Sequence, residues 1–421
     1  MNYKEIIKGK LSRAAGFFIT FMRWTLISAV IGIVCGFLGA AFHLSIDLVT
    51  EIRMEHSWLI YLLPIGGIII AFLYRQSHMR RHKGTDNIIE SVRGHERVPL
   101  RTAPLIFIAT VITHLCGGSA GREGAALQLG GSIGFKAAEL LKLDEKDRTL
   151  VVMCGMSAFF SALFGTPLTA ALFSIEVTSV GIMYYAGLIP CTVSALTAYS
   201  VTHLIGIEST AYKFIAAPEF NLYSVMSVAL IAILCAAISV IFCMMLHGSS
   251  ALMKKAFKNE YKRILVGSAL VIALTLICST NDYNGAGTHV INAAAHGEAV
   301  PWAFALKMIF TAITISAGFK GGEIVPTFFV GATFGCFMAG LIGLDSGFGA
   351  AVGMIAMFCG MLNCPVASII LSIEMFGDEG IMLFAIASGI SYMLSGYYGL
   401  YHSQKIMYSK TKAEFINADA K

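Results

Sequence analysis

The sequence predicts an all-α polytopic membrane protein with two repeated halves and many tilted and broken helices. Of its 421 residues, 57% are hydrophobic and only 13% are charged, whereas soluble domains carry about 25% charged residues. A bilayer is crossed by roughly 20 apolar residues. Runs without Lys, Arg, Asp or Glu that approach or exceed this length are Trp24–His43, Trp58–Tyr74, Leu150–Ile175, Leu222–His247, Ile264–Thr280, Ser346–Ile373 and Ile381–His402.

The expected organisation has four parts. Residues 1–16 form a cytoplasmic N-terminal segment, 17–210 the first transmembrane repeat, 222–400 the second, and 401–421 a C-terminal helix and cytoplasmic tail. Lys and Arg gather before the first span and within 75–101, 254–263 and 405–412, and are absent from 264–306. Because cytoplasmic loops carry an excess of Lys and Arg, we expect both termini in the cytoplasm and the protein in the cell inner membrane. These clusters indicate topology, so no nucleic-acid partner is expected.

The two halves repeat each other in sequence. Pro167 and Glu176 recur 198 residues later as Pro365 and Glu374. The matched acids predict a shared structural task, such as accepting hydrogen bonds from a helix start. Internal repeats are typical of secondary transporters and channels, whose sites form where broken helices point their N-termini at an anion. Three glycines recur at an interval of 201 residues, which aligns position 123 with position 324: Gly121, Gly130 and Gly134 match Gly322, Gly331 and Gly335.

The stretch 117–124, Gly-Gly-Ser-Ala-Gly-Arg-Glu-Gly, is the best candidate for a functional site. It places Arg122 and Glu123 between two long apolar runs, where ions cost several kcal/mol unless function requires them. Glycines let the backbone turn and expose its N–H groups, and a helix start adds partial positive charge. These features predict an anion pocket in which Glu123, when ionised, acts as a substitute anion and, when protonated, leaves. An Arg122–Glu123 ion pair is the competing interpretation; adjacent helical residues do not face each other, which disfavours it.

At this point the residues show a resemblance. The chain is similar to the CLC anion channels and transporters, and more narrowly to their fluoride–proton antiporter branch. Family members carry Gly-(Lys/Arg)-Glu-Gly, matched here by residues 121–124, and Gly-x-Phe-x-Pro, matched by 322–326. Their first motif, Gly-Ser-Gly-Ile-Pro, has its counterpart in Gly84-Thr85-Asp86-Asn87-Ile88, and their late tyrosine in Tyr401. The resemblance covers nearly the whole chain and implies an inverted repeat and a homodimer.

Three features resemble the fluoride branch: the sequence of residues 118–124, the altered first motif, and Val177 at the position where chloride–proton exchangers carry a second glutamate. Thr85, however, keeps a hydroxyl where that branch often carries Met or Asn. The resemblance implies Glu123 as gate and proton carrier, and we expect Arg122 to position its loop. The residues expected at the anion site are Thr85, Gly121, Arg122, Gly124, Ile324, Val325 and Tyr401.

The resulting hypothesis is a membrane antiporter, not an enzyme, that exports fluoride in exchange for protons and needs no cofactor or metal. The alternative is a chloride–proton exchanger or passive chloride channel of the same fold. The ten cysteines show no metal-ligand spacing. An intramembrane serine enzyme built on Ser157 with His114 or His203 is disfavoured, because the glycine that a nucleophile turn needs after the serine is missing.

Overall fold

The computed structural model describes residues 3–79, 83–94, 96–212 and 217–421. The basic connection 75–101 is therefore described except for residues 80–82 and 95. Helices of the first half are α1 (Tyr3–Glu55), η1 (Ser57–Leu62), α2 (Leu63–Gln76), α3 (Thr85–Val92), α4 (Thr102–Leu115), α5 (Glu123–Leu140), α6 (Glu145–Phe164), α7 (Pro167–Glu176), η2 (Tyr185–Gly187) and α8 (Leu188–Leu204).

Helices of the second half are α9 (Leu222–Ala256), α10 (Glu260–Cys278), α11 (Thr288–Ala295), α12 (Ala303–Ala317), α13 (Ile324–Ile342), α14 (Ser346–Leu362), α15 (Pro365–Phe376) and α16 (Ile381–Leu394). Within the described ranges, six helical stretches are long and apolar enough to cross a membrane. Other apolar helices, such as α4, α12 and α15, are shorter. These shorter helices agree with the broken helices that the sequence predicts.

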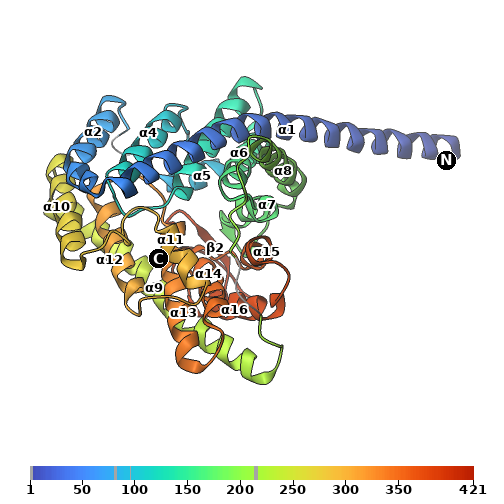
Figure 1. The fold of residues 1–421 in the computed structure, drawn as a ribbon. Coiled ribbons are helices and arrows are strands. Elements are labelled where there is room, and N and C mark those ends of the chain that lie inside the picture. The colour runs from blue at the N-terminus through green and yellow to red at the C-terminus, as the bar shows by residue number, and fades with distance from the viewer. Residues whose placement is uncertain (1–2, 80–82, 95, 213–216) are drawn as a thin grey trace.

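The prediction of an all-α membrane architecture is confirmed, and Figure 1 shows the first-half helices above the second-half helices. The two halves are built alike: α5 packs on α6 as α13 packs on α14. Both interfaces depend on glycine, because a Cβ at Gly130 would collide with the backbone of Gly155, and one at Gly331 with that of Gly353. Such close backbone contact is typical of helices packed inside membranes.

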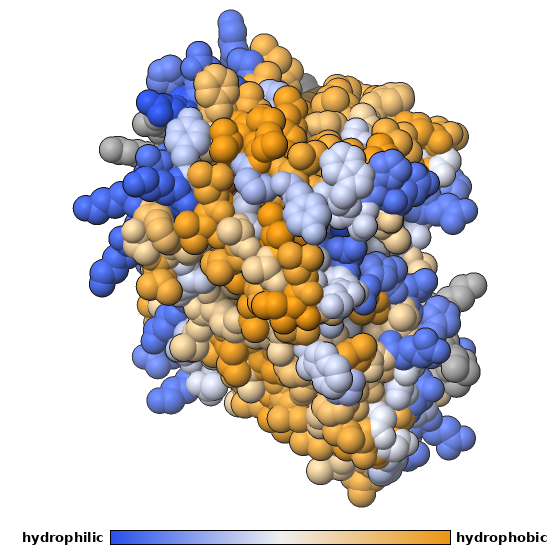
Figure 2. Space-filling model, turned by 60° about the vertical axis from the view of Figure 1, so that its left-hand side comes forward, coloured by the Kyte–Doolittle hydropathy of each residue, from blue (hydrophilic) through white to orange (hydrophobic). Residues whose placement is uncertain are grey.

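The outer surface is apolar where lipid would contact it. Figure 2 shows one face on which apolar side chains form a continuous band between hydrophilic margins. Large apolar side chains on α1, α9 and α10, among them Phe37, Leu230 and Leu276, are exposed. An exposed apolar area of this extent is unfavourable in water and favourable against lipid chains.

Two expected boundaries require correction. The N-terminal segment 1–16 does not end where the first span begins, because α1 continues as one helix from Tyr3 to Glu55. The predicted C-terminal helix in 401–421 is wrong: this region forms β2 (Lys405–Tyr408) and β3 (Phe415–Asp419). They join β1 (Ser179–Val180) in a sheet of order β1-β2-β3, parallel between β1 and β2 and antiparallel between β2 and β3. Strand pairing with β1 satisfies backbone groups that a short isolated helix would leave to water.

Candidate functional site

The two glycine-rich breaks meet at the centre of the protein. The Gly121 amide donates to the Gly322 carbonyl at 2.6 Å, and the Gly322 amide donates back to the Gly121 carbonyl at 2.7 Å. A Cβ at Gly322 would collide with the backbone of Glu123 and Gly124. Glycine is therefore required for the approach of the chains, and this contact brings the starts of α5 and α13 together.

The Glu123 carboxylate lies between these two helix starts. Glu123 is the first residue of α5 and its side chain is fully buried. Its Oε2 accepts hydrogen bonds from the backbone amides of Arg122 at 3.0 Å and Val325 at 3.3 Å. Its Oε1 is buried and, within the part of the chain that the structure describes, has no hydrogen-bond partner. Amides at helix starts bind anions, because they are unpaired within the helix and lie at its positive end.

The side chain of Arg122 turns away from Glu123. Its Nη1 donates to Asp47 Oδ1 on α1 at 3.1 Å, and the other oxygen of Asp47 pairs with His43 at 2.9 Å. The competing interpretation of an Arg122–Glu123 ion pair is therefore wrong. Since α1 holds the guanidinium, Arg122 positions the loop, and its contribution at Glu123 is a backbone N–H.

A cavity of about 610 Å³ reaches the site from one side. Two of the expected site residues, Thr85 and Tyr401, line it. Its wall also carries the cations Lys83, Lys254, Arg263 and Lys320. Cations outnumber carboxylates on this wall, so the cavity attracts anions. Lys83 lies in the connection before α3, where its hydrogen bonds to Glu90 raise the pKa of the ammonium.

Thr85 and Tyr401 line the cavity next to the Glu123 loop. The Thr85 hydroxyl, at the start of α3, donates to the Gly124 carbonyl at 3.2 Å. The Tyr401 side chain is only 4% exposed, and its hydroxyl has no hydrogen-bond partner among the described residues. A buried unpaired donor costs free energy unless a ligand accepts from it. The Tyr401 hydroxyl is therefore a donor that remains available to a ligand in this cavity.

Two residues at this site escaped sequence reasoning. Gln128 is buried on α5, and its Nε2 donates to the Gly124 carbonyl at 3.2 Å. Glu323, directly before α13, lines the cavity. A carboxylate close to Lys320 within the second glycine break was the available signal for Glu323. An amide inside an uncharged run was the available signal for Gln128.

The remaining expected residues surround the same point. Gly121 forms the chain bridge, Gly124 accepts from Thr85 and Gln128, and Val325 donates to Glu123. Ile324 is fully buried as the first residue of α13 and contributes an apolar wall. The structure thus brings all eight expected residues to the junction of the two breaks, with the Arg122 side chain directed outward.

Buried cations lie near the first break on α1 and α12. Lys307 is fully buried, and its Nζ donates to the carbonyls of Tyr283 at 3.1 Å and Gly285 at 2.7 Å. A Cβ at Gly117 would lie 3.6 Å from Cδ of Arg53, a side chain that makes no ion pair with any described residue. Basic side chains that are not paired with a carboxylate among the described residues therefore lie beside the first glycine break.

Outside the junction, the expectation for the matched acids is confirmed. Glu374 accepts from the amides of Leu168 and Thr169, both at 2.8 Å, at the start of α7. Glu176 accepts from the amides of Val366 at 3.2 Å and Ala367 at 2.9 Å, at the start of α15. Each half therefore supplies a carboxylate that caps a helix of the other half.

The serine proposed for an intramembrane enzyme has a packing role. The Ser157 hydroxyl donates to the Cys191 carbonyl on α8 at 3.0 Å. His114 is hydrogen-bonded elsewhere, with its Nε2 3.3 Å from the Gly121 carbonyl. The serine and this histidine therefore do not form a nucleophile–base pair.

The sequence and the fold are similar to those of known proteins. Residues 66–396 match the family model described as voltage gated chloride channel. A chloride/fluoride channel protein of Pseudomonas syringae pv. tomato is 35% identical over 395 residues, which cover 92% of this chain and 87% of that protein. The crystal structure of a CLC-type fluoride/proton antiporter superposes with a TM-score of 0.88 at 30% identity, covering 91% of this chain and 98% of the other.

A more distant structure shares the fold alone. A slow cyanobacterial Cl⁻/H⁺ antiporter superposes with a TM-score of 0.76 at 18% identity, over 89% of this chain and 94% of the other. The family model spans most of the chain, and the bacterial relative covers nearly all of it. The chain belongs to the voltage gated chloride channel family, the CLC family of anion channels and transporters.

Proposed function

We propose that the protein exports fluoride across the membrane in exchange for protons, with the Glu123 carboxylate as gate and proton carrier. The supporting observation is the place of this carboxylate. Its Oε2 accepts two backbone amides at the starts of α5 and α13, where a substrate anion would otherwise bind. The Pseudomonas relative is named a chloride/fluoride channel protein, and a similar solved structure is described as a fluoride/proton antiporter. Both names agree with fluoride as the substrate.

The coupling follows from charge. An ionised Glu123 competes with the substrate, because two anions cannot share one small dry pocket. When Glu123 gains a proton, its hydrogen bonds to the amides weaken and the side chain leaves the pocket. The anion then accepts from the Arg122 and Val325 amides, with Thr85, Gln128 and Tyr401 as donors on the cavity side. Loss of the proton returns the carboxylate and expels the anion, so the two ions move in opposite directions.

Fluoride binding needs close donors, because this small ion is strongly hydrated. The buried Tyr401 hydroxyl without a partner and the Gln128 amide supply hydrogen bonds that replace water. Lys320 adds charge to the cavity wall. The alternative is a chloride–proton exchanger or a passive chloride channel of the same fold. The name of the Pseudomonas relative includes both chloride and fluoride, so the experiment below compares the two ions.

We further propose a bacterial inner membrane as the location, with the cavity open to the cytoplasm and the protein as a homodimer. Lys83, Lys254 and Arg263 from two basic connections line the cavity, and basic connections are retained in the cytoplasm. Accessibility of cysteines introduced beside Lys254 to membrane-impermeant reagents tests the sidedness. Cross-linking in liposomes tests the dimer.

The decisive experiment records fluoride, chloride and pH together in proteoliposomes. A fluoride gradient should drive uphill proton movement, and a chloride gradient should drive less. Glu123→Gln should abolish proton movement, because an amide cannot carry the proton. Glu139→Gln, which alters an exposed carboxylate paired with Lys136, is the matched control and should leave both fluxes unchanged. Proton movement by Glu123→Gln at the wild-type rate would remove Glu123 from the gate.

A further inference from the structure

Thr85 and Tyr401 line the same cavity, although they are more than 300 residues apart in the sequence. Thr85 begins α3, and Tyr401 lies in the connection between α16 and β2. A site that distinguishes ions of different size needs its donors at a fixed separation. Contacts between α3 and the connection that carries Tyr401 therefore affect which anion the site prefers.

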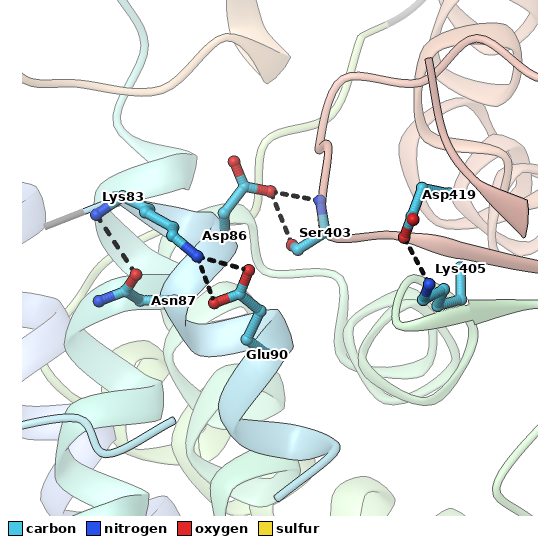
Figure 3. Close-up of polar contacts among 7 residues, drawn as sticks. All are labelled: Lys83, Asp86, Asn87, Glu90, Ser403, Lys405 and Asp419. Carbon is cyan, nitrogen blue, oxygen red and sulfur yellow. Dashed lines mark hydrogen bonds and ion pairs between the residues drawn. The ribbon is translucent and has the colours of Figure 1, made fainter. Parts of the chain in front are cut away.

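One such contact is a pair of hydrogen bonds between the neighbours of Thr85 and Tyr401. Asp86 Oδ1 accepts from the Ser403 amide at 2.9 Å and from the Ser403 hydroxyl at 2.6 Å (Figure 3). Asp86 directly follows Thr85, and Ser403 is two residues after Tyr401. Hydrogen bonds to a carboxylate are about twice as strong as neutral ones. We call this contact the Asp86–Ser403 clamp.

The Tyr401 connection is fixed on its other side. The Leu400 amide donates to the Met361 carbonyl at 2.8 Å. Gln404 Nε2 donates to the carbonyls of Leu362 at 2.7 Å and Val177 at 2.9 Å. The connection is thus held to the end of α14 and to the segment that precedes β1. The clamp joins the Tyr401 connection to α3, which carries Thr85.

The residue type at position 86 is unexpected in an anion path. Asp86 lines the cavity, and a negative charge there opposes the entry of an anion. Its Oδ1 is engaged by both Ser403 donors, which is an arrangement suited to holding a backbone in place. A neutral side chain would serve an anion path better unless the carboxylate had this structural task.

We propose that the Asp86–Ser403 clamp sets the separation of Thr85 and Tyr401 and thereby the preference of the site for the smaller anion. Asp86 and Ser403 are positioning residues, because they act through their neighbours. The inference rests on the proposed function for the identity of the anion. Release of the clamp lets the donors move apart, which disfavours fluoride more than the larger chloride.

The test measures the ratio of fluoride to chloride efflux from liposomes, relative to that of the wild type, for Asp86→Ala, Ser403→Ala and the double variant. Each single variant should lower the ratio by about five- to tenfold, because only part of the free energy of a hydrogen bond to a charged group is expected to distinguish the two anions. The double variant should be no worse than Asp86→Ala. Asp86→Asn, which keeps an acceptor, should restore part of the ratio.

The variants separate the clamp from a plain effect of charge. Removal of the Asp86 charge alone would speed both anions and leave their ratio unchanged. Ser403→Ala keeps the charge and most of the fold, so a lowered ratio in this variant identifies the clamp. Glu90→Gln on α3 and Asp419→Asn on β3 break the neighbouring ion pairs with Lys83 and Lys405. Both control variants should keep the wild-type ratio.

An unchanged ratio in folded Asp86→Ala and Ser403→Ala, or an equal change in the two controls, would overturn the clamp. Thermal unfolding in detergent establishes that each variant is folded. Failure of the proposed function has a different signature, because it appears in the wild type as absent proton coupling or as equal fluxes of both anions. A wild type without any preference between the anions would contradict both proposals, whereas loss of proton coupling alone would leave the clamp standing.

Discussion

The two glycine breaks have the same backbone and different chemistry. Each leads into a helix that packs closely on its successor, and the breaks bridge each other through Gly121 and Gly322. The first break places Glu123 at the start of α5, whereas the second places Ile324 at the start of α13. One carboxylate is therefore bound by amides from both helix starts. The two breaks therefore share a backbone arrangement, but only the first places a carboxylate at its helix start.

A second comparison shows where the halves remain alike. Glu176 and Glu374 accept backbone amides at equivalent helix starts in the opposite half. This exchange of caps is reciprocal because the task is structural and both halves need it. The contrast teaches that the duplicated carboxylates cap helices across the two halves, whereas Glu123 has no counterpart and is the carboxylate for which we propose a role in transport.

The largest effect is expected from making the two breaks alike. Glu123→Ile gives α5 the same first residue as α13, where Ile324 stands. The two helix starts then no longer differ at this position. Proton movement should fall to the level of protein-free liposomes while the protein stays folded, because an apolar residue suits a buried site. Coupled fluoride and pH recordings check the result. Retained proton movement would mean that the asymmetry is not the source of coupling.

The next effect tests the shared backbone. A Cβ at Gly322 meets the backbone of Glu123 and Gly124, which cannot rotate away. Gly322→Ala should therefore destabilise the protein by about 1–3 kcal/mol, the usual cost of overpacking. Thermal unfolding in detergent measures the change. Gly389→Ala on α16, where a Cβ would meet nothing within 4 Å, is the matched control. Equal stability of both variants would contradict the need for close approach.

A smaller effect should distinguish the caps from the gate. Glu176→Ala leaves the buried Ala367 amide without its acceptor and should cost about 1–3 kcal/mol. Glu374→Ala should cost less, because Glu374 is partly exposed. Proton movement per anion should be unchanged in both variants. Altered coupling in either one would assign that carboxylate to the proton path and break the contrast with Glu123.

The smallest effect concerns the cavity wall. Lys320 lies in the second break and lines the cavity, whereas the matched Ser119 is buried and hydrogen-bonded to Thr311 at 3.0 Å. Lys320→Gln should lower anion efflux roughly two- to threefold at low ionic strength through weaker attraction. The difference should shrink at high salt, where the charge is screened. Lys136→Gln, outside the cavity wall, should show no salt-dependent change.

Much of the architecture could be predicted from the sequence, because it depends on local composition. Uncharged runs predict spans, and recurring Pro, Gly and Glu predict the repeat. The error at 401–421 has a physical reason: Lys405–Tyr408 pairs with β3, and also with β1, which lies more than 220 residues earlier in the chain. Strand pairing between distant segments leaves no local signal beyond a weak alternation of apolar and polar residues.

The site shows the same division. Glu123 stood out because a carboxylate in an apolar run is costly. Gln128 and the Asp86–Ser403 contact did not stand out, because polar residues at a span or a loop are common and their partners are not neighbours in sequence. The direction of the Arg122 side chain depended on Asp47 of α1, which no local pattern connects to the motif.

The sequence by itself determined that this chain is a membrane protein, that its two halves repeat each other, and that position 123 carries an acid in a glycine turn. These properties follow from hydropathy, residue spacing and the conformational freedom of glycine. Only the tertiary structure decided which amides bind that acid, and that Thr85 and Tyr401 share one cavity wall. The physical reason is that hydrogen bonds and cavities are set by the packing of distant helices.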